Sequence, residues 1–244
     1  MKISGFVIHL KRAISRYGQA EQLCASLPFH CRIIDAVDGL GAQNTPQRAN
    51  HIPGLFQPKY PFELRTGEIG AFLSHRACWQ AILDEGLDAG LILEDDVALD
   101  IESFNKALAL SARAAVVDSY IRFPVIGREK HGRTIAVDGG MTLFEPRMVG
   151  LGAQAQLVGK NAARRLLDIT VSYDRPIDSL LQLRWLTHVP MLAVMPNGVT
   201  EISGSLGGSQ IGKPKSLFER IRREFMRPYY RGRIAIRSLA EPLQ

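Results

Sequence analysis

Three consecutive carboxylates, Glu94, Asp95 and Asp96, directly follow the apolar residues 90–93. Residues 91–93 predict a short central strand, and in a layered α/β protein the C-terminal end of such a strand opens into the ligand crevice. Carboxylates packed together there repel one another unless a cation lies among them. The triplet therefore predicts a divalent metal held against a phosphate, and the alternative interpretation is a solvated acidic turn.

The residues around this triplet alternate between short apolar runs and segments of helical period, which indicates a layered α/β fold. The expected strands cover residues 3–10, 29–36, 91–93, 119–125, 134–137, 141–144, 154–158 and 189–194. The expected helices cover residues 14–27, 67–85, 102–115, 161–169 and 177–186. The proline-rich residues 39–66 predict a long functional or mobile loop, and the Gly/Ser-rich residues 197–216 predict a lid or linker.

The clearest helix, over residues 67–85, immediately precedes the acidic triplet. Large apolar side chains follow one arc of it and small residues follow the opposite arc, so we expect it to pack on both sides. His75 lies at the edge of the large-residue arc and Arg76 lies within it, which is an unusual place for a charge. Arg76 could pair with the acidic triplet, or its charged head could extend from the core edge to solvent.

The composition is that of an ordinary globular protein. With 244 residues, 46% hydrophobic and 22% charged, the chain suits one large domain or a core domain with a tail, at residues 1–200 and 201–244. The cysteines Cys24, Cys31 and Cys78 form no CxxC pair, which predicts reduced thiols and argues against structural zinc. No apolar run approaches the roughly 20 residues of a membrane span, and no signal peptide is evident. We therefore expect a cytoplasmic protein.

The positive charge is concentrated in the last segment. Residues 213–244 hold nine Lys/Arg and three Glu, a balance that equals the +6 net charge of the whole chain. Apolar and basic side chains alternate there with a helical period, which predicts a basic amphipathic helix ending near Pro228. Such a helix favours an anionic membrane surface, at the cytoplasmic face of the inner membrane, over nucleic acid, which we do not expect as a partner. Docking of the helix on the protein body is the alternative.

Several stretches of the chain form ordered motifs. They are Val7-Ile8-His9-Leu10-Lys11-Arg12 with Arg16, Asp35-Ala36-Val37-Asp38-Gly39, Gly67-Glu68-Ile69-Gly70-Ala71-Phe72-Leu73-Ser74-His75-Arg76 with Trp79, Leu93-Glu94-Asp95-Asp96-Val97, residues 152–163, and Pro176-Ile177-Asp178. Together they resemble glycosyltransferase family 25, which includes bacterial lipooligosaccharide β-galactosyltransferases and collagen galactosyltransferases. The block that ends in the acidic triplet is the most specific. His9, Gln156 and Gly159 depart from this pattern, because Asn or Ser, Tyr and Ser are usual there.

The resemblance implies a GT-A-like nucleotide-diphospho-sugar transferase fold, in which a mixed central sheet is flanked by helices. It implies inverting transfer of a hexose, with UDP-galactose as the usual nucleotide-sugar donor, to a glycan or glycolipid acceptor such as lipopolysaccharide. A divalent metal, Mn²⁺ or Mg²⁺, would neutralise the leaving diphosphate, with Asp96 as direct ligand and Glu94 acting on the ribose or through water. The departures at His9 and Gln156 leave open a catalytically degenerate protein that acts as a peripheral membrane interaction module.

The same motifs supply the remaining candidate residues. Those expected to contact the sugar donor are His9, Arg12, Arg16, Asp38, Gly39, Ser74, His75, Arg76, Glu94 and Asp95. The structural alternatives are solvent-exposed helix charges for the arginines, a chain turn at Asp38 and a satisfied buried histidine at position 75. Inversion by direct displacement needs a base near the acceptor hydroxyl. Asp178 is the candidate base and Asp174 the alternate, while stabilisation of a helix N-terminus is the structural alternative for Asp178.

Overall fold

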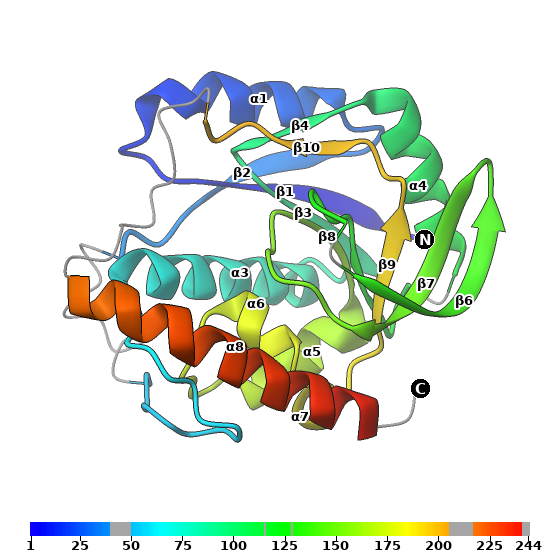
Figure 1. The fold of residues 1–244 in the computed structure, drawn as a ribbon. Coiled ribbons are helices and arrows are strands. Elements are labelled where there is room, and N and C mark those ends of the chain that lie inside the picture. The colour runs from blue at the N-terminus through cyan, green and yellow to red at the C-terminus, as the bar shows by residue number, and fades with distance from the viewer. Residues whose placement is uncertain (40–49, 115, 128, 205–216, 241–244) are drawn as a thin grey trace.

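Glu94 ends the third strand of an eight-stranded mixed sheet with the spatial order β2-β1-β3-β8-β5-β9-β7-β6 (Figure 1). This computed structural model describes residues 1–39, 50–114, 116–127, 129–204 and 217–240, and for residues 217–223 it describes the backbone alone. In spatial order the strands span Cys31–Asp35 (β2), Ile3–His9 (β1), Ala89–Glu94 (β3), Ala155–Gly159 (β8), Tyr120–Arg122 (β5), Met191–Met195 (β9), Met141–Met148 (β7) and Lys130–Asp138 (β6).

Strands β2, β1 and β3 run parallel, so their C-terminal ends meet at one edge of the sheet. The register places His9 opposite Asp35, and Ile8 opposite Glu94. Strand β8 is antiparallel to both β3 and β5, which makes the sheet mixed. Residues 89–93 are all buried, as expected for a parallel strand covered on both faces. The predicted α/β class with a mixed central sheet is confirmed.

Helices cover both faces of this sheet (Figure 1). The short η1 (Ile14–Arg16), α1 (Tyr17–Ser26) and α4 (Ile101–Arg113) lie on one side, where α1 and α4 share a hydrophobic core with the sheet. On the other side α3 (Thr66–Asp84), α5 (Lys160–Ile169) and α6 (Ile177–Leu181) share a second core, and α7 (Arg184–Thr187) follows α6. Helix α3 buries large side chains such as Phe72 and small ones such as Ser74, as its two arcs predicted.

A small second sheet was not predicted. It pairs β4 (Val97–Leu99) with β10 (Val199–Glu201) in antiparallel fashion. Strand β10 lies within the expected lid or linker 197–216, of which residues 205–216 fall outside the described residues. Three-residue strands carry too short a pattern for periodicity to reveal. The pairing matters for the site because Ile202 N donates to Asp96 O at 2.8 Å, which holds the backbone of the acidic triplet.

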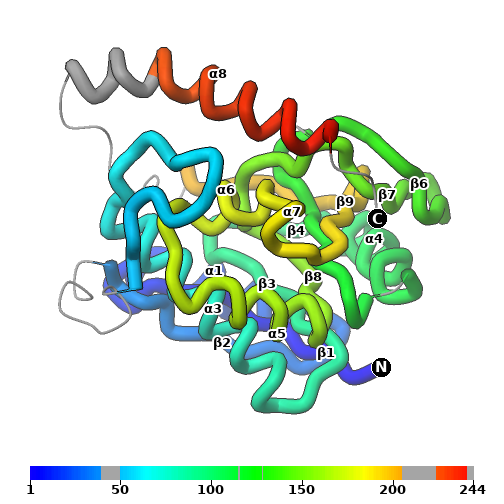
Figure 2. The backbone as a smooth tube through the Cα atoms, turned by 90° about the horizontal axis from the view of Figure 1, so that it is seen from below, coloured from blue at the N-terminus to red at the C-terminus, as the bar shows by residue number. Residues whose placement is uncertain are grey.

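The last helix, α8 (Leu217–Ala240), continues through Pro228, so the predicted end of the helix near this residue is wrong. Proline removes one backbone hydrogen bond and crowds the preceding turn. Beyond it, however, Tyr230 and Ile234 are buried in a small core with Leu183. This packing outweighs the helix-breaking tendency of the proline. Figure 2 shows α8 running along the outside of the molecule beside the segment that precedes α3.

Helix α8 has one docked face and one open face. Tyr230, Ile234 and Ser238 are buried against the body, which bears out the docking alternative for that face. Among the side chains of this helix that the structure describes, the large apolar ones that are exposed are Phe225, Tyr229, Ile236 and Leu239. Within the described part of the chain, no helix is long and apolar enough to cross a membrane. The division of the chain into a core domain of residues 1–200 and a tail of residues 201–244 stays a prediction.

Candidate active site at the ends of the parallel strands

Asp95 is held by two basic side chains from the N-terminal part of the chain. Nδ1 of His9, at the end of β1, lies 2.8 Å from Asp95 Oδ2. Nη1 of Arg16 donates to Asp95 Oδ1 at 3.0 Å and to Asp96 Oδ2 at 3.3 Å. His9, Arg16 and Asp95 are all buried. Asp95 therefore has both oxygens engaged by protein groups, and its role in this geometry is to organise the cluster.

Asp96 is the carboxylate that the protein leaves least satisfied. Its Oδ1 is buried and has no hydrogen-bond partner among the described residues. Burial first, and then repulsion from Glu94, raise the pKa of Asp96 to about 7, although Arg16 lowers it. A buried carboxylate with a free oxygen and a raised pKa is stabilised by a cation placed next to it.

Glu94 is positioned by a second chain of polar contacts. Nε2 of His75 lies 3.3 Å from Glu94 Oε1, and Nδ1 of the same ring lies 3.1 Å from Gln156 Nε2. His75 and Gln156 are fully buried, whereas the Glu94 side chain is 29% exposed. Two of the three departures from the family pattern, His9 and Gln156, thus lie within hydrogen-bonding distance of the acidic triplet or of its supporting histidine.

The triplet fits a divalent cation through Asp96 and Glu94. Asp95 does not fit, because His9 and Arg16 already occupy its oxygens. Among the residues that the structure describes, no group of three or more His, Cys, Asp or Glu side chains is placed to hold a metal. Magnesium-type ions often use only one or two carboxylates and complete their shell with substrate phosphates and water. Two carboxylates beside an open cavity satisfy that requirement.

A cavity of about 140 Å³ adjoins the triplet on the side of β1 and β2. Arg12, Arg16, Asp38, Gly39 and Ser74 all line it, so the fold brings these predicted residues together with the triplet. Arg12 Nε donates to Asp38 Oδ2 at 2.9 Å. The cavity is acidic on one side and bounded by backbone on the other, so a phosphorylated ligand would need a cation between its phosphates and the carboxylates.

The backbone wall of this cavity depends on a close approach between the segment after β2 and helix α3. Ser74 Oγ accepts from Val37 N at 2.8 Å and donates to Gly70 O at 2.7 Å. A Cβ atom on Gly39 would lie 1.8 Å from Thr66 O, and one on Gly70 would lie 2.4 Å from Val37 O. Glycine is therefore required at both positions, and Ser74 acts by holding this wall in place.

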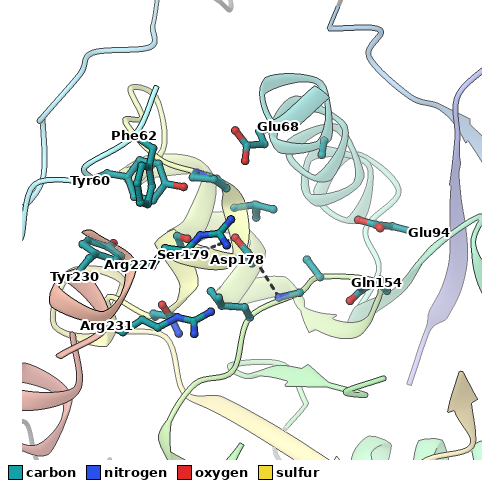
Figure 3. Close-up of a pocket in the computed structure, with 17 residues that line it drawn as sticks. Tyr60, Phe62, Glu68, Glu94, Gln154, Asp178, Ser179, Arg227, Tyr230 and Arg231 are labelled. Carbon is teal, nitrogen blue, oxygen red and sulfur yellow. Dashed lines mark hydrogen bonds between the residues drawn. The ribbon is translucent and has the colours of Figure 1, made fainter. Parts of the chain in front are cut away.

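A larger cavity of about 370 Å³ lies on the other side of the triplet (Figure 3). Asp178 faces it from the first turn of α6 and accepts from Gly152 N at 3.1 Å and from Ser179 N at 2.6 Å. Glu94 and Ala71 line this cavity and the smaller one alike. The two cavities therefore meet at Glu94, with Asp178 on the side of the larger.

Asp174, the alternate base, is fully buried and lies in neither cavity. Its oxygens accept from Arg175 Nε at 2.6 Å, from Arg175 Nη2 at 3.0 Å and from Phe56 N at 2.9 Å. Arg175 in turn donates to Tyr230 Oη at 2.8 Å and to Pro58 O at 3.1 Å. This pair joins the segment before α3 to helix α8. The sequence did not predict that Asp174 and Arg175 join these two segments, because adjacent charged residues in a loop are normally exposed to solvent.

Arg76 is not brought to the acidic triplet. Its Nη1 donates to Leu167 O at 3.1 Å and to Thr170 Oγ1, at the C-terminal end of α5. Burial lowers the pKa of Arg76 from its ordinary value. Pairing with the carboxylates, one of the two alternatives for Arg76, is therefore wrong, and Arg16 takes that position because the turn after β1 lies over the ends of the parallel strands.

Comparison with known proteins identifies the family of this chain. The family model described as glycosyltransferase family 25 (LPS biosynthesis protein) matches residues 2–181. Procollagen galactosyltransferase 2 of Homo sapiens is 32% identical over 108 residues, which cover 43% of this chain and 17% of that protein. The inactive glycosyltransferase 25 family member 3 of Homo sapiens is 36% identical over 101 residues, which cover 39% of this chain and 16% of that protein.

The similarity to these relatives is confined to a small part of each: the chain matches about a sixth of their length. Among solved structures, a glycosyltransferase involved in the glycosylation of the major capsid of PBCV-1 is 13% identical, with a TM-score of 0.37 and coverage of 70% of this chain and 66% of that one. The family match covers the three parallel strands, the acidic triplet and Asp178. The chain belongs to glycosyltransferase family 25.

Proposed function

We propose that this protein is an inverting, metal-dependent hexosyltransferase that moves galactose from UDP-galactose to a glycan or glycolipid acceptor of the lipopolysaccharide type. The observation that carries the proposal is the meeting of two cavities at Glu94, with Asp178 on the larger side. A transferase needs one site for the nucleotide and another for the acceptor, and the reacting atoms must meet where these sites join. We assign the smaller cavity to the nucleotide diphosphate and the larger to the acceptor.

Asp96 and Glu94 are the proposed holders of Mn²⁺ or Mg²⁺. When bound, the ion would supply positive charge for the diphosphate that leaves. The protein's own contribution is to keep both carboxylates in place: Arg16 and His9 orient the cluster through Asp95, and His75 orients Glu94. Asp38, Gly39 and Arg12 line the nucleotide side. Family relatives include a protein named as inactive, so turnover is the decisive measurement.

Asp178 is the proposed general base, which takes the proton of the attacking acceptor hydroxyl. Its two backbone hydrogen bonds fix the carboxylate in orientation and leave it facing the larger cavity. For Asp174 we propose a positioning role, because its two carboxylate oxygens already accept hydrogen bonds from Arg175 and from Phe56 N.

Asp178→Asn is expected to lower the hydrolysis of UDP-galactose, with water as acceptor and Mn²⁺ present, by roughly 10²–10⁴-fold. The affinity for UDP, measured by calorimetry, should stay unchanged because Asp178 lies outside the smaller cavity. Asp168→Asn, an exposed carboxylate on α5, is the matched control and should retain the wild-type rate. The proposed function would be refuted if the wild-type protein neither binds UDP nor hydrolyses any UDP-sugar.

We further propose that the protein acts as a peripheral protein at the cytoplasmic face of the membrane, through the open face of α8. Phe225, Tyr229, Ile236 and Leu239 form an exposed stripe at helical spacing, and Arg233 and Arg237 lie at one flank of it. An apolar stripe beside cationic side chains suits an anionic lipid surface. Such a location would bring the larger cavity close to a glycolipid acceptor.

Ile236→Ser combined with Leu239→Ser is expected to reduce co-flotation with phosphatidylglycerol-containing vesicles at least fivefold, since each exposed side chain contributes buried apolar area in the lipid. Val137→Ser combined with Val171→Ser is the control, because these side chains are also exposed but lie away from α8. Equal flotation of the two double variants would show that α8 does not mediate membrane contact.

A further inference from the structure

Two arginines from helix α8 line the larger cavity. Arg227 and Arg231 are four residues apart, so they project from successive turns on the same side of the helix. Figure 3 shows Arg227 and Arg231 reaching into the cavity from the side of helix α8, with Arg227 drawn beside Asp178 and with Glu94 on the opposite side. Any molecule that fills the cavity and reaches the proposed base therefore also passes these two cations.

No described residue engages either arginine through a polar contact. Within the described residues, Arg227 and Arg231 have no hydrogen bond and no ion pair. Other arginines of the same helix do have partners: Arg233 lies over the Tyr229 ring at 6.0 Å, and Arg237 lies over the Trp185 ring at 4.7 Å. Two adjacent guanidinium groups that repel each other at the end of a cavity are stabilised by a bound anion.

The helix that carries these cations is anchored at this point. Tyr230, which lies between them in sequence, is buried and accepts from Arg175 at 2.8 Å. The Tyr230 ring also contacts the Tyr60 ring edge-to-face, with 5.5 Å between centroids. A site that holds its charged groups on an anchored element loses little conformational entropy when the ligand binds.

The same end of the cavity has an aromatic wall. Tyr60, Phe62 and Tyr230 all line it, and the Tyr60 and Phe62 rings pack edge-to-face at 5.5 Å. Aromatic rings beside polar and charged groups are suited to the apolar face of a sugar ring whose substituents are polar. The wall and the two arginines together describe a subsite for a charged sugar.

We propose that Arg227 and Arg231 bind an anionic group, a phosphate or a carboxylate, on a sugar unit of the acceptor. The proposal rests on the assignment of the larger cavity to the acceptor. Glu94 and Glu68 repel an anion from the side of the cavity next to the acidic triplet, whereas Arg227 and Arg231 attract it to the side that helix α8 forms. This charge distribution orients the acceptor so that a neutral hydroxyl, and not its charged group, meets the base.

The test compares methyl β-glucoside, its 6-phosphate and methyl β-glucuronide as probes, by calorimetry on the full chain with and without UDP and Mn²⁺. We expect the phosphate or the carboxylate probe to bind roughly tenfold more tightly than the neutral one. The probe that binds more tightly shows whether the subsite prefers a phosphate or a carboxylate on the sugar. In Arg227→Gln combined with Arg231→Gln, the three probes should bind alike, while Arg164→Gln, at an exposed position of α5 outside the cavity, should keep the wild-type preference.

Three results would overturn the proposal. The first is equal binding of the three probes to the wild type. The second is an anion preference that survives in the double variant. The third is a UDP affinity that falls in the double variant as much as the anion preference does, because the arginines would then serve the sugar donor. If the wild type does not bind UDP at all, that result counts against the proposed function, and the comparison of the three probes still tests the anion subsite.

Discussion

Asp96→Asn is expected to abolish sugar transfer and, at the same time, to stabilise the metal-free protein. Activity should fall by roughly 10²–10³-fold or more, because Asp96 is the proposed direct ligand of the metal ion that would neutralise the leaving diphosphate. The free energy of unfolding at pH 7.5 should rise by on the order of 2 kcal/mol, since the variant removes a buried charge repelled by Glu94. Thermal melts would show this as an increase of about 4–8 °C.

The pH dependence of that stabilisation follows from the direction of the pKa shift. The pKa of Asp96 is raised from 3.8 to about 7, so the folded state binds the proton more tightly than the unfolded state does. The wild type therefore loses stability relative to Asp96→Asn as the pH rises from about 4 to 7, and the difference is constant above that range. Melts of both proteins across this range, with Asp168→Asn as control, would measure it. A pH-independent difference, or a variant less stable than the wild type, would contradict the repulsion inferred here.

Arg175→Met is expected to cause the largest loss of stability of any substitution considered. It breaks the fully buried ion pair with Asp174 and the hydrogen bond to Tyr230, and it leaves the Asp174 carboxylate buried without its cation. Such uncompensated burial costs about 3–5 kcal/mol. Urea denaturation measures this loss, and faster trypsin cleavage within α8 would show that the helix has detached.

The double variant Asp174→Asn with Arg175→Met separates the two causes. Because the buried charge is gone, we expect the double variant to recover at least half of the stability lost by Arg175→Met alone. Arg113→Met, which removes an exposed ion pair with Asp138, should cost less than about 1 kcal/mol. A double variant as unstable as the single one would mean that the packing of Arg175, and not the unpaired charge of Asp174, holds the segment.

The elements that carry long, periodic patterns were predictable. The apolar run before Glu94 and the two-sided pattern of helix α3 predicted the central strand and the helix that precedes it, because the distribution of apolar residues is the strongest local signal of secondary structure. The motif residues Arg12, Arg16, Asp38 and Ser74 do converge on the triplet. They converge because each follows or faces the end of a parallel strand, and these ends meet in α/β sheets.

The features that the sequence did not predict are contacts between residues far apart in the chain. The pairing of His9 and Arg16 with Asp95 spans 86 and 79 residues. No local pattern distinguishes Arg16 from Arg76, although only Arg16 lies beside the carboxylates. The continuation of α8 through Pro228 has the same cause, because burial of Tyr230 is a tertiary contact that propensity does not contain.

The position of helix α8 has a consequence for how specificity is distributed along this chain. The family match ends at residue 181, whereas Arg227, Tyr230 and Arg231 stand at the far wall of the larger cavity. The parts that would handle the leaving group, and most of the lining of the larger cavity, thus lie within the shared portion of the chain, whereas the wall that helix α8 contributes lies beyond it. In such an arrangement, a different C-terminal helix alters one charged wall of the acceptor cavity and leaves the residues proposed for the chemical step unchanged.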